Sequence, residues 1–170
     1  MKKLKRAVCI AAVYCTAFIT GTIPLPAAGK TAALPDTSGS VHSFTVADAY
    51  GRTLDAALQT NKVVFINFWA LTCAPCKAEM PTINNLANYY KNDTNLLVLP
   101  VDLDHNFPAA NRYFNEQKFT LKVDTPAAIV PQALFTGVLP TTVVINRKGK
   151  IVLFREGENK YDAPSFFLFI

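Results

Sequence analysis

The chain of 170 residues is poor in histidine, with only His42 and His105, and neither lies at metal-ligand spacing from another candidate ligand. A structural zinc site takes four Cys or His ligands, so a single close pair of cysteines would need two more from elsewhere. The sequence therefore disfavours a zinc site. His105 follows a predicted strand in a loop, where a histidine is most often simply exposed.

Acidic residues are missing from the beginning of the chain, where none precedes Asp36. Four of the first six residues are Lys or Arg, an apolar run fills residues 7–23, and small residues follow at Ala27 and Ala28. This pattern predicts a signal peptide over residues 1–28, or an N-terminal membrane anchor through the apolar run. Both alternatives place the remainder outside the cytoplasm, either secreted or tethered facing outward.

An excess of charge of either sign is also lacking once the leader is set aside. The formal charge of +5 and the pI near 9.1 include the four leader cations, and the remainder carries 13 basic against 12 acidic residues. A nucleic-acid partner is therefore not predicted, because such proteins concentrate positive charge in the folded domain.

Cysteine is scarce in the exported part. Of four cysteines, Cys9 and Cys15 lie in the leader, which leaves Cys73 and Cys76. An exported domain of about 140 residues can bury its own core without a disulfide scaffold. The remaining pair is better explained by chemistry than by bracing.

The chain shows no internal repeat and no low-complexity block. Residues 29–43 predict a flexible lead-in, and residues 44–170 a single domain. Strand and helix patterns alternate and end in a hairpin, which predicts an α/β fold with a mixed sheet. The expected elements are strands at residues 44–48, 62–70, 95–104 and 119–124, a short return at 54–58, helices at 75–90, 109–118 and 127–135, and a hairpin over 141–156 with its turn at 147–149.

The final segment, DAPSFFLFI, begins like a helix, with Asp162 as N-cap and Pro164 in the first turn. It stops after five consecutive apolar residues with no C-cap signal. We expect a C-terminal helix that is cut short.

The stretch NFWALTCAPCKAEMP places Cys73 and Cys76 at a strand-to-helix junction. Cys73 at a helix N-terminus would favour a thiolate, and Pro75 suits the first turn because it has no N–H to leave unpaired. Cys76, one turn further, can close and reopen a disulfide by thiol exchange, which requires no metal or organic cofactor. Half of a zinc site and an inert structural disulfide remain alternatives, although so small a loop gains little stability from closure.

Phe-Trp-Ala-x-x-Cys-x-Pro-Cys-Lys after a β-branched strand resembles the thioredoxin superfamily. The longer match CAPCKAEMP, with Glu79 and Pro81, is similar to the extracytoplasmic TlpA/ResA-like thiol–disulfide oxidoreductases, over roughly residues 44–155. The resemblance implies a thioredoxin-like fold, with a mixed central β-sheet flanked by helices and an N-terminal strand or hairpin extension. It also implies a redox-active Cys73–Cys76 disulfide.

The segment GVLPTTVVINRKGKIV is similar to the part of that family that carries a cis-proline. The resemblance implies a cis bond between Leu139 and Pro140, with Thr141 beside it, facing the cysteines and binding an extended substrate peptide. An ordinary turn or edge-strand proline is the alternative. Trp69 is expected to pack and to shape the rim of the site.

Two positions refine the family assignment. Asn67 stands where cytoplasmic thioredoxins carry a buried aspartate, and Glu79 matches an acidic residue that the ResA-like group places near its active site. The resemblance implies that Glu79 modulates Cys76 or moves its proton. A solvated charge on the helix surface is the alternative.

The resulting hypothesis is an extracytoplasmic, periplasmic-type enzyme, likened to reductases that serve cytochrome c maturation. It would reduce protein disulfides and draw electrons from a membrane donor of the CcdA/DsbD kind, acting as a monomer without cofactor. A disulfide oxidase or isomerase is the first alternative, because the Ala-Pro dipeptide does not fix the direction. A peroxiredoxin-like peroxidase and a metal-handling chaperone are weaker alternatives.

Overall fold

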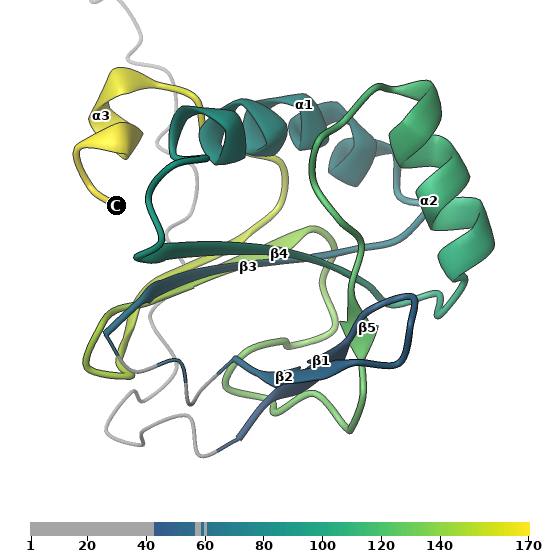
Figure 1. The fold of residues 1–170 in the computed structure, drawn as a ribbon, viewed down its shortest axis with the longest axis horizontal. Coiled ribbons are helices and arrows are strands. Elements are labelled where there is room, and N and C mark those ends of the chain that lie inside the picture. The colour runs from purple at the N-terminus through teal and green to yellow at the C-terminus, as the bar shows by residue number, and fades with distance from the viewer. Residues whose placement is uncertain (1–42, 57–58, 60) are drawn as a thin grey trace, which may run out of the picture.

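The central sheet has four strands and passes through the middle of the domain (Figure 1). The computed structural model describes residues 43–170 except 57, 58 and 60. Strand β3 (Val63–Trp69) pairs in parallel with β4 (Leu96–Asp102) and antiparallel with β6 (Thr141–Ile145). Strand β7 (Ile151–Glu156) completes the order β4-β3-β6-β7, so the sheet is mixed as predicted.

The helices α1 (Ala74–Tyr89), α2 (Phe107–Glu116) and α3 (Pro164–Phe167) cover one face of this sheet (Figure 1). Alternate residues of β3 explain the two layers, because successive side chains of a strand point to opposite faces. Phe65 and Trp69 pack in the cluster under the helices, whereas Ile66 and Phe68 pack in the cluster on the other face. Asn67 shares its face with Phe65 and Trp69, which directs a polar side chain towards α1.

A second, small sheet covers the opposite face and contains the N-terminal hairpin. It is formed by β1 (Thr45–Ala47), β2 (Thr53–Asp55) and β5 (Thr125–Pro126) in the order β2-β1-β5. The return after the first strand is thus itself a strand, antiparallel to β1.

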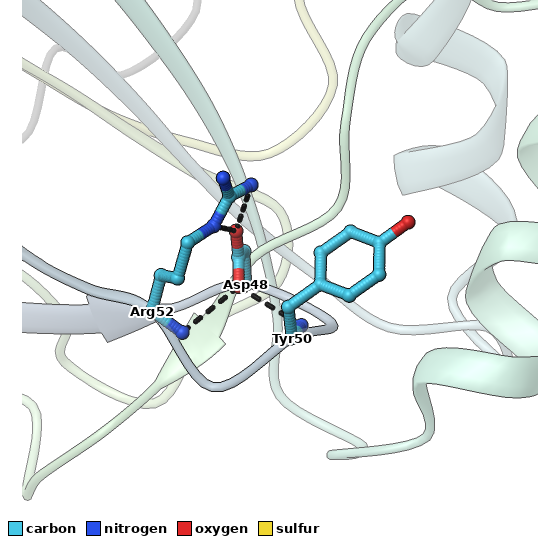
Figure 2. Close-up of polar contacts among 3 residues, drawn as sticks. All are labelled: Asp48, Tyr50 and Arg52. Atoms are coloured by element: carbon cyan, nitrogen blue, oxygen red, sulfur yellow. Dashed lines mark hydrogen bonds and ion pairs between the residues drawn. The ribbon is translucent and has the colours of Figure 1, made fainter.

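Asp48 closes the turn between β1 and β2 (Figure 2). Its Oδ1 accepts hydrogen bonds from the backbone N–H groups of Tyr50 and Arg52, and its Oδ2 forms an ion pair with the Arg52 guanidinium at 2.6 Å. Gly51 adopts φ +75°, a conformation that glycine reaches without steric cost. The turn is therefore fixed by one carboxylate and one glycine.

Two predicted elements between β4 and β6 are wrong. Residues 119–124 do not form a strand, and the pairing starts only with a bridge at Asp124 followed by β5. Residues 127–135 do not form a helix but one turn, in which the N–H groups of Leu134 and Phe135 both contact the Pro131 carbonyl. Pro131 explains the difference, because a proline interrupts helical hydrogen bonding and disfavours helix in the residue before it.

The predicted N-cap of the last helix is also wrong. Ala163, in an extended conformation, precedes Pro164 and makes no side-chain cap. The Asp162 carboxylate instead accepts a hydrogen bond from the Asn85 side chain of α1 at 2.9 Å. The acidic side chain therefore ties the C-terminal segment to α1.

Strand β4 is an edge of the four-stranded sheet and contains a proline. The Pro100 carbonyl accepts a hydrogen bond from the Asp124 N–H at 3.1 Å, and the Asp102 N–H donates to the Asp124 carbonyl at 2.7 Å. The edge is thus partly covered by the chain that leads into β5.

The predicted leader over residues 1–28, its apolar run and most of the lead-in lie outside the described residues. Within the described part of the chain, no helix is long and apolar enough to cross a membrane.

Candidate active site

The two cysteines lie at the junction between β3 and α1. A short turn at residues 70–72 follows Trp69, and Cys73 is the N-cap of α1. Cys73 and Cys76 form a disulfide, with their Cα atoms 5.3 Å apart. The Cys73 Sγ also accepts a hydrogen bond from the Cys76 N–H at 3.2 Å. A free backbone donor of the first helical turn therefore points at the sulfur that would carry negative charge after reduction.

The two sulfurs differ in access. Cys73 is half-buried, whereas the Cys76 side chain is completely buried. Pro75 between them is exposed on the first turn of α1, where its missing N–H leaves no hydrogen bond unmade. The pair therefore has one accessible and one internal sulfur.

The turn before Cys73 is anchored by the loop after β4. The Asp104 carboxylate accepts a hydrogen bond from the Leu71 N–H at 2.7 Å, and the Leu103 N–H donates to the Trp69 carbonyl at 3.0 Å. His105 in this loop is exposed, as expected from the sequence, and has φ +53°. Asp104 carried no sequence signal, because its partner is a backbone amide 33 residues away.

Glu79 lies one turn beyond Cys76 and is 1% exposed. Its Oε1 accepts a hydrogen bond from the Asn67 side-chain amide at 2.7 Å, and its Oε2 accepts one from the Asn159 backbone N–H at 2.9 Å. Asn67 also donates to the Thr142 hydroxyl at 2.9 Å, which spans the pair of strands β3 and β6. The carboxyl is therefore a buried member of a polar cluster between the sheet and α1.

Burial raises the pKa of Glu79 from 4.5 to about 7. The hydrogen bonds from Asn159 and Asn67 lower this pKa and so offset part of the effect, while the nearby Glu158 carboxylate raises it further. A carboxyl with such a pKa exchanges a proton readily near neutral pH.

The Leu139–Pro140 peptide bond is cis. Thr141, the first residue of β6, pairs with Phe68 near the end of β3, which places Pro140 at the edge of the sheet from which the cysteine turn emerges. Leu139 packs against the same cluster as Cys73 and Cys76. The Thr141 hydroxyl donates to the Val138 carbonyl at 2.6 Å, so it braces this loop internally.

Trp69 is completely buried and lies beneath the site, with ring centroids 5.2 Å from Phe114 and 5.9 Å from Tyr113 of α2. It thus supports the turn from the core side and does not reach the surface rim. Lys77 lies over the Tyr113 ring at 5.4 Å, on the outer side of α1.

Three residues of the polar cluster around Glu79 were not found from the sequence: Thr142, which binds Asn67, Asn159, which binds Glu79, and Tyr161, which lies beside them. Thr142 faces Asn67 across the strand pair, and Asn159 reaches Glu79 through its backbone. A polar residue inside a strand of apolar residues was the only available signal, and it was present at Asn67 and Thr142. Among the described residues, no group of three or more potential ligands could hold a metal ion.

Known proteins resemble the chain in sequence and fold. A family model described as Redoxin matches residues 27–166. The protein named thiol-disulfide oxidoreductase ResA from Bacillus anthracis is 32% identical over 112 residues, covering 65% of this chain and 64% of that protein, just under two thirds of its length. The protein of the same name from Bacillus thuringiensis subsp. konkukian is 31% identical over 130 residues, covering 74% of this chain and 73% of that protein.

The fold has a counterpart among crystal structures. A protein from Chlorobium tepidum, described as a thiol:disulfide interchange protein DsbE, superimposes with a TM-score of 0.63 at 25% identity, covering 76% of this chain and 92% of the other. The fold and site define a thioredoxin-like protein with a CxxC disulfide. The chain belongs to the Redoxin family and, within it, to the ResA-like proteins.

Proposed function

We propose that the chain is a thiol–disulfide oxidoreductase that reduces disulfides in other proteins outside the cytoplasm. The observation that carries the proposal is the pairing of a half-exposed Cys73 at the N-terminus of α1 with a fully buried Cys76. This asymmetry supports an exchange enzyme, because a structural disulfide has no need of one accessible sulfur beside a helix terminus.

In the first step, the Cys73 thiolate attacks one sulfur of a substrate disulfide. A bond forms between Cys73 and that sulfur, the substrate disulfide breaks, and the second substrate sulfur leaves with the electron pair and takes a proton. The Cys76 N–H that points at the Cys73 Sγ would stabilise the attacking thiolate. We propose that the loop at Leu139, Pro140 and Thr141 contacts the extended substrate.

In the second step, Cys76 attacks the Cys73 sulfur and releases the other half of the substrate as a thiolate, which then takes a proton. Cys76 must lose its own proton first, and Glu79 is the neighbouring buried base, one turn away on the same helix. Its pKa of about 7 supports proton transfer in either direction near neutral pH. No metal or organic cofactor takes part in this cycle.

The oxidised Cys73–Cys76 pair must then be reduced again. We propose a membrane thiol donor of the CcdA/DsbD kind, with residues 1–28 acting as a signal peptide or as an anchor through residues 7–23. The relatives named thiol-disulfide oxidoreductase support the chemistry, and cytochrome c maturation is the proposed setting of a monomeric enzyme. A disulfide oxidase or isomerase is the second candidate, since the same site would serve both directions.

The reduction potential of the Cys73–Cys76 pair tests the direction. It is measured by equilibrating the purified domain in a glutathione or dithiothreitol redox series and quantifying free thiols. A potential more negative than about −200 mV supports a reductant, whereas a value near about −120 mV, typical of strong periplasmic oxidants, would overturn it in favour of an oxidase. Loss of both thiols to a stoichiometric bound metal in the purified protein would contradict the redox function itself.

A further inference from the structure

Tyr161 is a buried tyrosine whose hydroxyl the proposed reaction does not use. Its ring is completely buried and meets Phe65 and Phe166 edge-on, each with ring centroids 5.0 Å apart. A phenylalanine would make the same contacts. Among the described residues the Tyr161 hydroxyl has no hydrogen-bond partner, although burying a polar group without one is unfavourable.

Tyr161 belongs to residues 157–162, a strap that lies along α1. The Asn159 N–H donates to Glu79 Oε2 at 2.9 Å, and the Tyr161 N–H donates to the Thr82 hydroxyl at 3.1 Å. Thr82 in turn donates to the Glu79 carbonyl at 2.8 Å. Tyr161 is thereby fixed beside Glu79, and its hydroxyl lies next to Thr142 and close enough to Glu79 for their charges to interact.

The Glu79 carboxyl has capacity for another donor. Each of its oxygens accepts one hydrogen bond, from Asn67 and from Asn159 respectively. An ionised carboxylate offers about four acceptor sites, and a buried one is stable only when donors surround it. A protonated carboxyl needs fewer donors, so the demand for a further one arises when Glu79 loses its proton.

The role of Tyr161 rests on the proposed exchange of a proton between Glu79 and Cys76. We propose that Tyr161 is a positioning residue whose hydroxyl donates a hydrogen bond to the Glu79 carboxylate whenever Glu79 has given up its proton. Burial raises the pKa of Tyr161, so the hydroxyl keeps its proton and remains able to donate.

The proton balance is complete within the site. When a thiolate donor attacks Cys73, the Cys73–Cys76 bond breaks and a bond to the donor sulfur forms. Cys76 leaves with the electron pair and takes the proton of the Glu79 carboxyl. Tyr161 then donates to the resulting carboxylate, and the hydrogen bond is released when Glu79 recovers its proton from Cys76.

Charged groups from several elements act on this equilibrium. Glu158 on the strap opposes the ionisation of Glu79, and Arg155 of β7 interacts with Tyr161. Cys76 lies on the same helix as Glu79 and is held in the disulfide in the oxidised protein. On the sheet side, β3 and β6 offer a neutral amide and a neutral hydroxyl.

The test is a ¹³C NMR titration of the Glu79 carboxyl carbon in the oxidised protein, with the signal assigned from Glu79→Gln. Tyr161→Phe removes only the hydroxyl and should raise the titration midpoint by about one pH unit, a tenfold higher proton affinity. Tyr90→Phe is the matched control, because the Tyr90 hydroxyl donates to the Phe167 carbonyl at 2.5 Å, far along α1 from Glu79. It should leave the midpoint unchanged.

A second measurement needs no substitution at Tyr161. The ζ-carbon signal of Tyr161 in the wild-type protein should move with the midpoint of Glu79, and Glu79→Gln should abolish that movement. A midpoint in Tyr161→Phe equal to that of wild type would overturn the proposal. So would a Tyr161 signal that stays constant through the Glu79 titration, which also decides the case if Tyr161→Phe does not fold.

These outcomes are separate from the test of function. A wild-type protein that exchanges no disulfides would end the proposed function and yet leave both titrations readable. An active protein in which Tyr161 and Glu79 titrate independently would end the present proposal alone.

Discussion

Asn67 of β3 donates a hydrogen bond to the Glu79 carboxyl of α1 across 2.7 Å, in the buried layer between sheet and helix. The other N–H of Asn67 is used by Thr142. The side chain thus supplies a neutral donor at a position where it cannot compete for the proton of Glu79. Glu79 can change its charge, while the strand beside it stays uncharged.

Asn67→Asp should convert this donor into a second acid. Two carboxyl groups would then face each other in a buried site, and one of them would hold a proton well above its ordinary pKa. We expect the free energy of unfolding to fall by about 3 kcal/mol at pH 8 and by clearly less at pH 5, where a shared proton is available. Urea unfolding at both values measures the difference.

Asn84→Asp is the matched control for that substitution. Asn84 is also buried on the face of α1, but its Oδ1 accepts hydrogen bonds from the N–H and hydroxyl of Thr120. A carboxylate can still accept both hydrogen bonds. We therefore expect Asn84→Asp to lower the free energy of unfolding only slightly and without the pH dependence. An equal loss in the two variants at pH 8 and pH 5 would contradict the role given to the Asn67–Glu79 contact.

The stability of the wild-type protein should fall as the pH rises through the window between 4.5 and about 7. In that window the folded protein keeps a proton on Glu79 that the unfolded chain has lost, so folding binds protons and is favoured at low pH. The expected contribution is on the order of 3 kcal/mol, because each pKa unit is worth about 1.4 kcal/mol. Chemical unfolding of wild type and Glu79→Gln from pH 4 to pH 8 measures it, and Glu79→Gln should flatten the profile.

Asp124 contributes to the same profile, since burial raises its pKa from 3.8 to about 7. Asp124, like Glu79, lowers the free energy of unfolding as the pH rises, so Asp124→Asn should remove a separate share of this pH dependence. The double variant should have a flatter profile between pH 5 and pH 7 than either single variant. A profile unchanged by both substitutions would refute the raised pKa values of these two acids.

Cys76→Ala should accumulate a mixed disulfide between Cys73 and its substrate. In the proposed cycle the buried Cys76 resolves the intermediate, so its loss should leave Cys73 linked to the substrate sulfur. Non-reducing gels and mass spectrometry detect the adduct, and Cys73→Ala serves as the control that forms none. Equal yields of adduct in the two variants would contradict the proposal that Cys73 is the attacking sulfur.

Asp104→Ala should loosen the turn that carries Cys73. The variant loses the acceptor of the Leu71 N–H, whereas Asp104→Asn retains an acceptor oxygen. We expect hydrogen exchange at Leu71 to accelerate about tenfold in the alanine variant, in line with one lost hydrogen bond to a charged group. The asparagine variant should stay close to wild type, and a Leu71 amide unaffected by both would show that Asp104 does not anchor the turn.

The sequence was sufficient for elements whose signal is local. The β-branched run of β3, the capping pattern around Cys73 and the hairpin of β6 and β7 each depend on near neighbours. Residues 127–135 misled because their composition favours a helix while Pro131 interrupts one. The N-cap predicted at Asp162 was wrong for a similar reason, because the Asp162 carboxylate binds Asn85 of α1 and does not cap its own helix.

The site was predictable only in part, for a related reason. Cys73 and Cys76 lie in one continuous stretch, so their helical spacing could be worked out, whereas Glu79 was implied only by the family resemblance. Asn159 meets Glu79 after 80 further residues of chain, and this contact depends on how the strap crosses α1. Neither periodicity nor composition encodes that crossing.

Pro100 has a consequence for the behaviour of the protein in concentrated solution. An edge strand with free N–H groups can recruit a strand from another molecule and begin aggregation. The middle of β4 cannot pair with such a strand, because Pro100 has no N–H and its carbonyl already accepts a hydrogen bond from the Asp124 N–H. The protein therefore carries its protection against fibrous self-association within the sheet itself, whatever the concentration at which it folds.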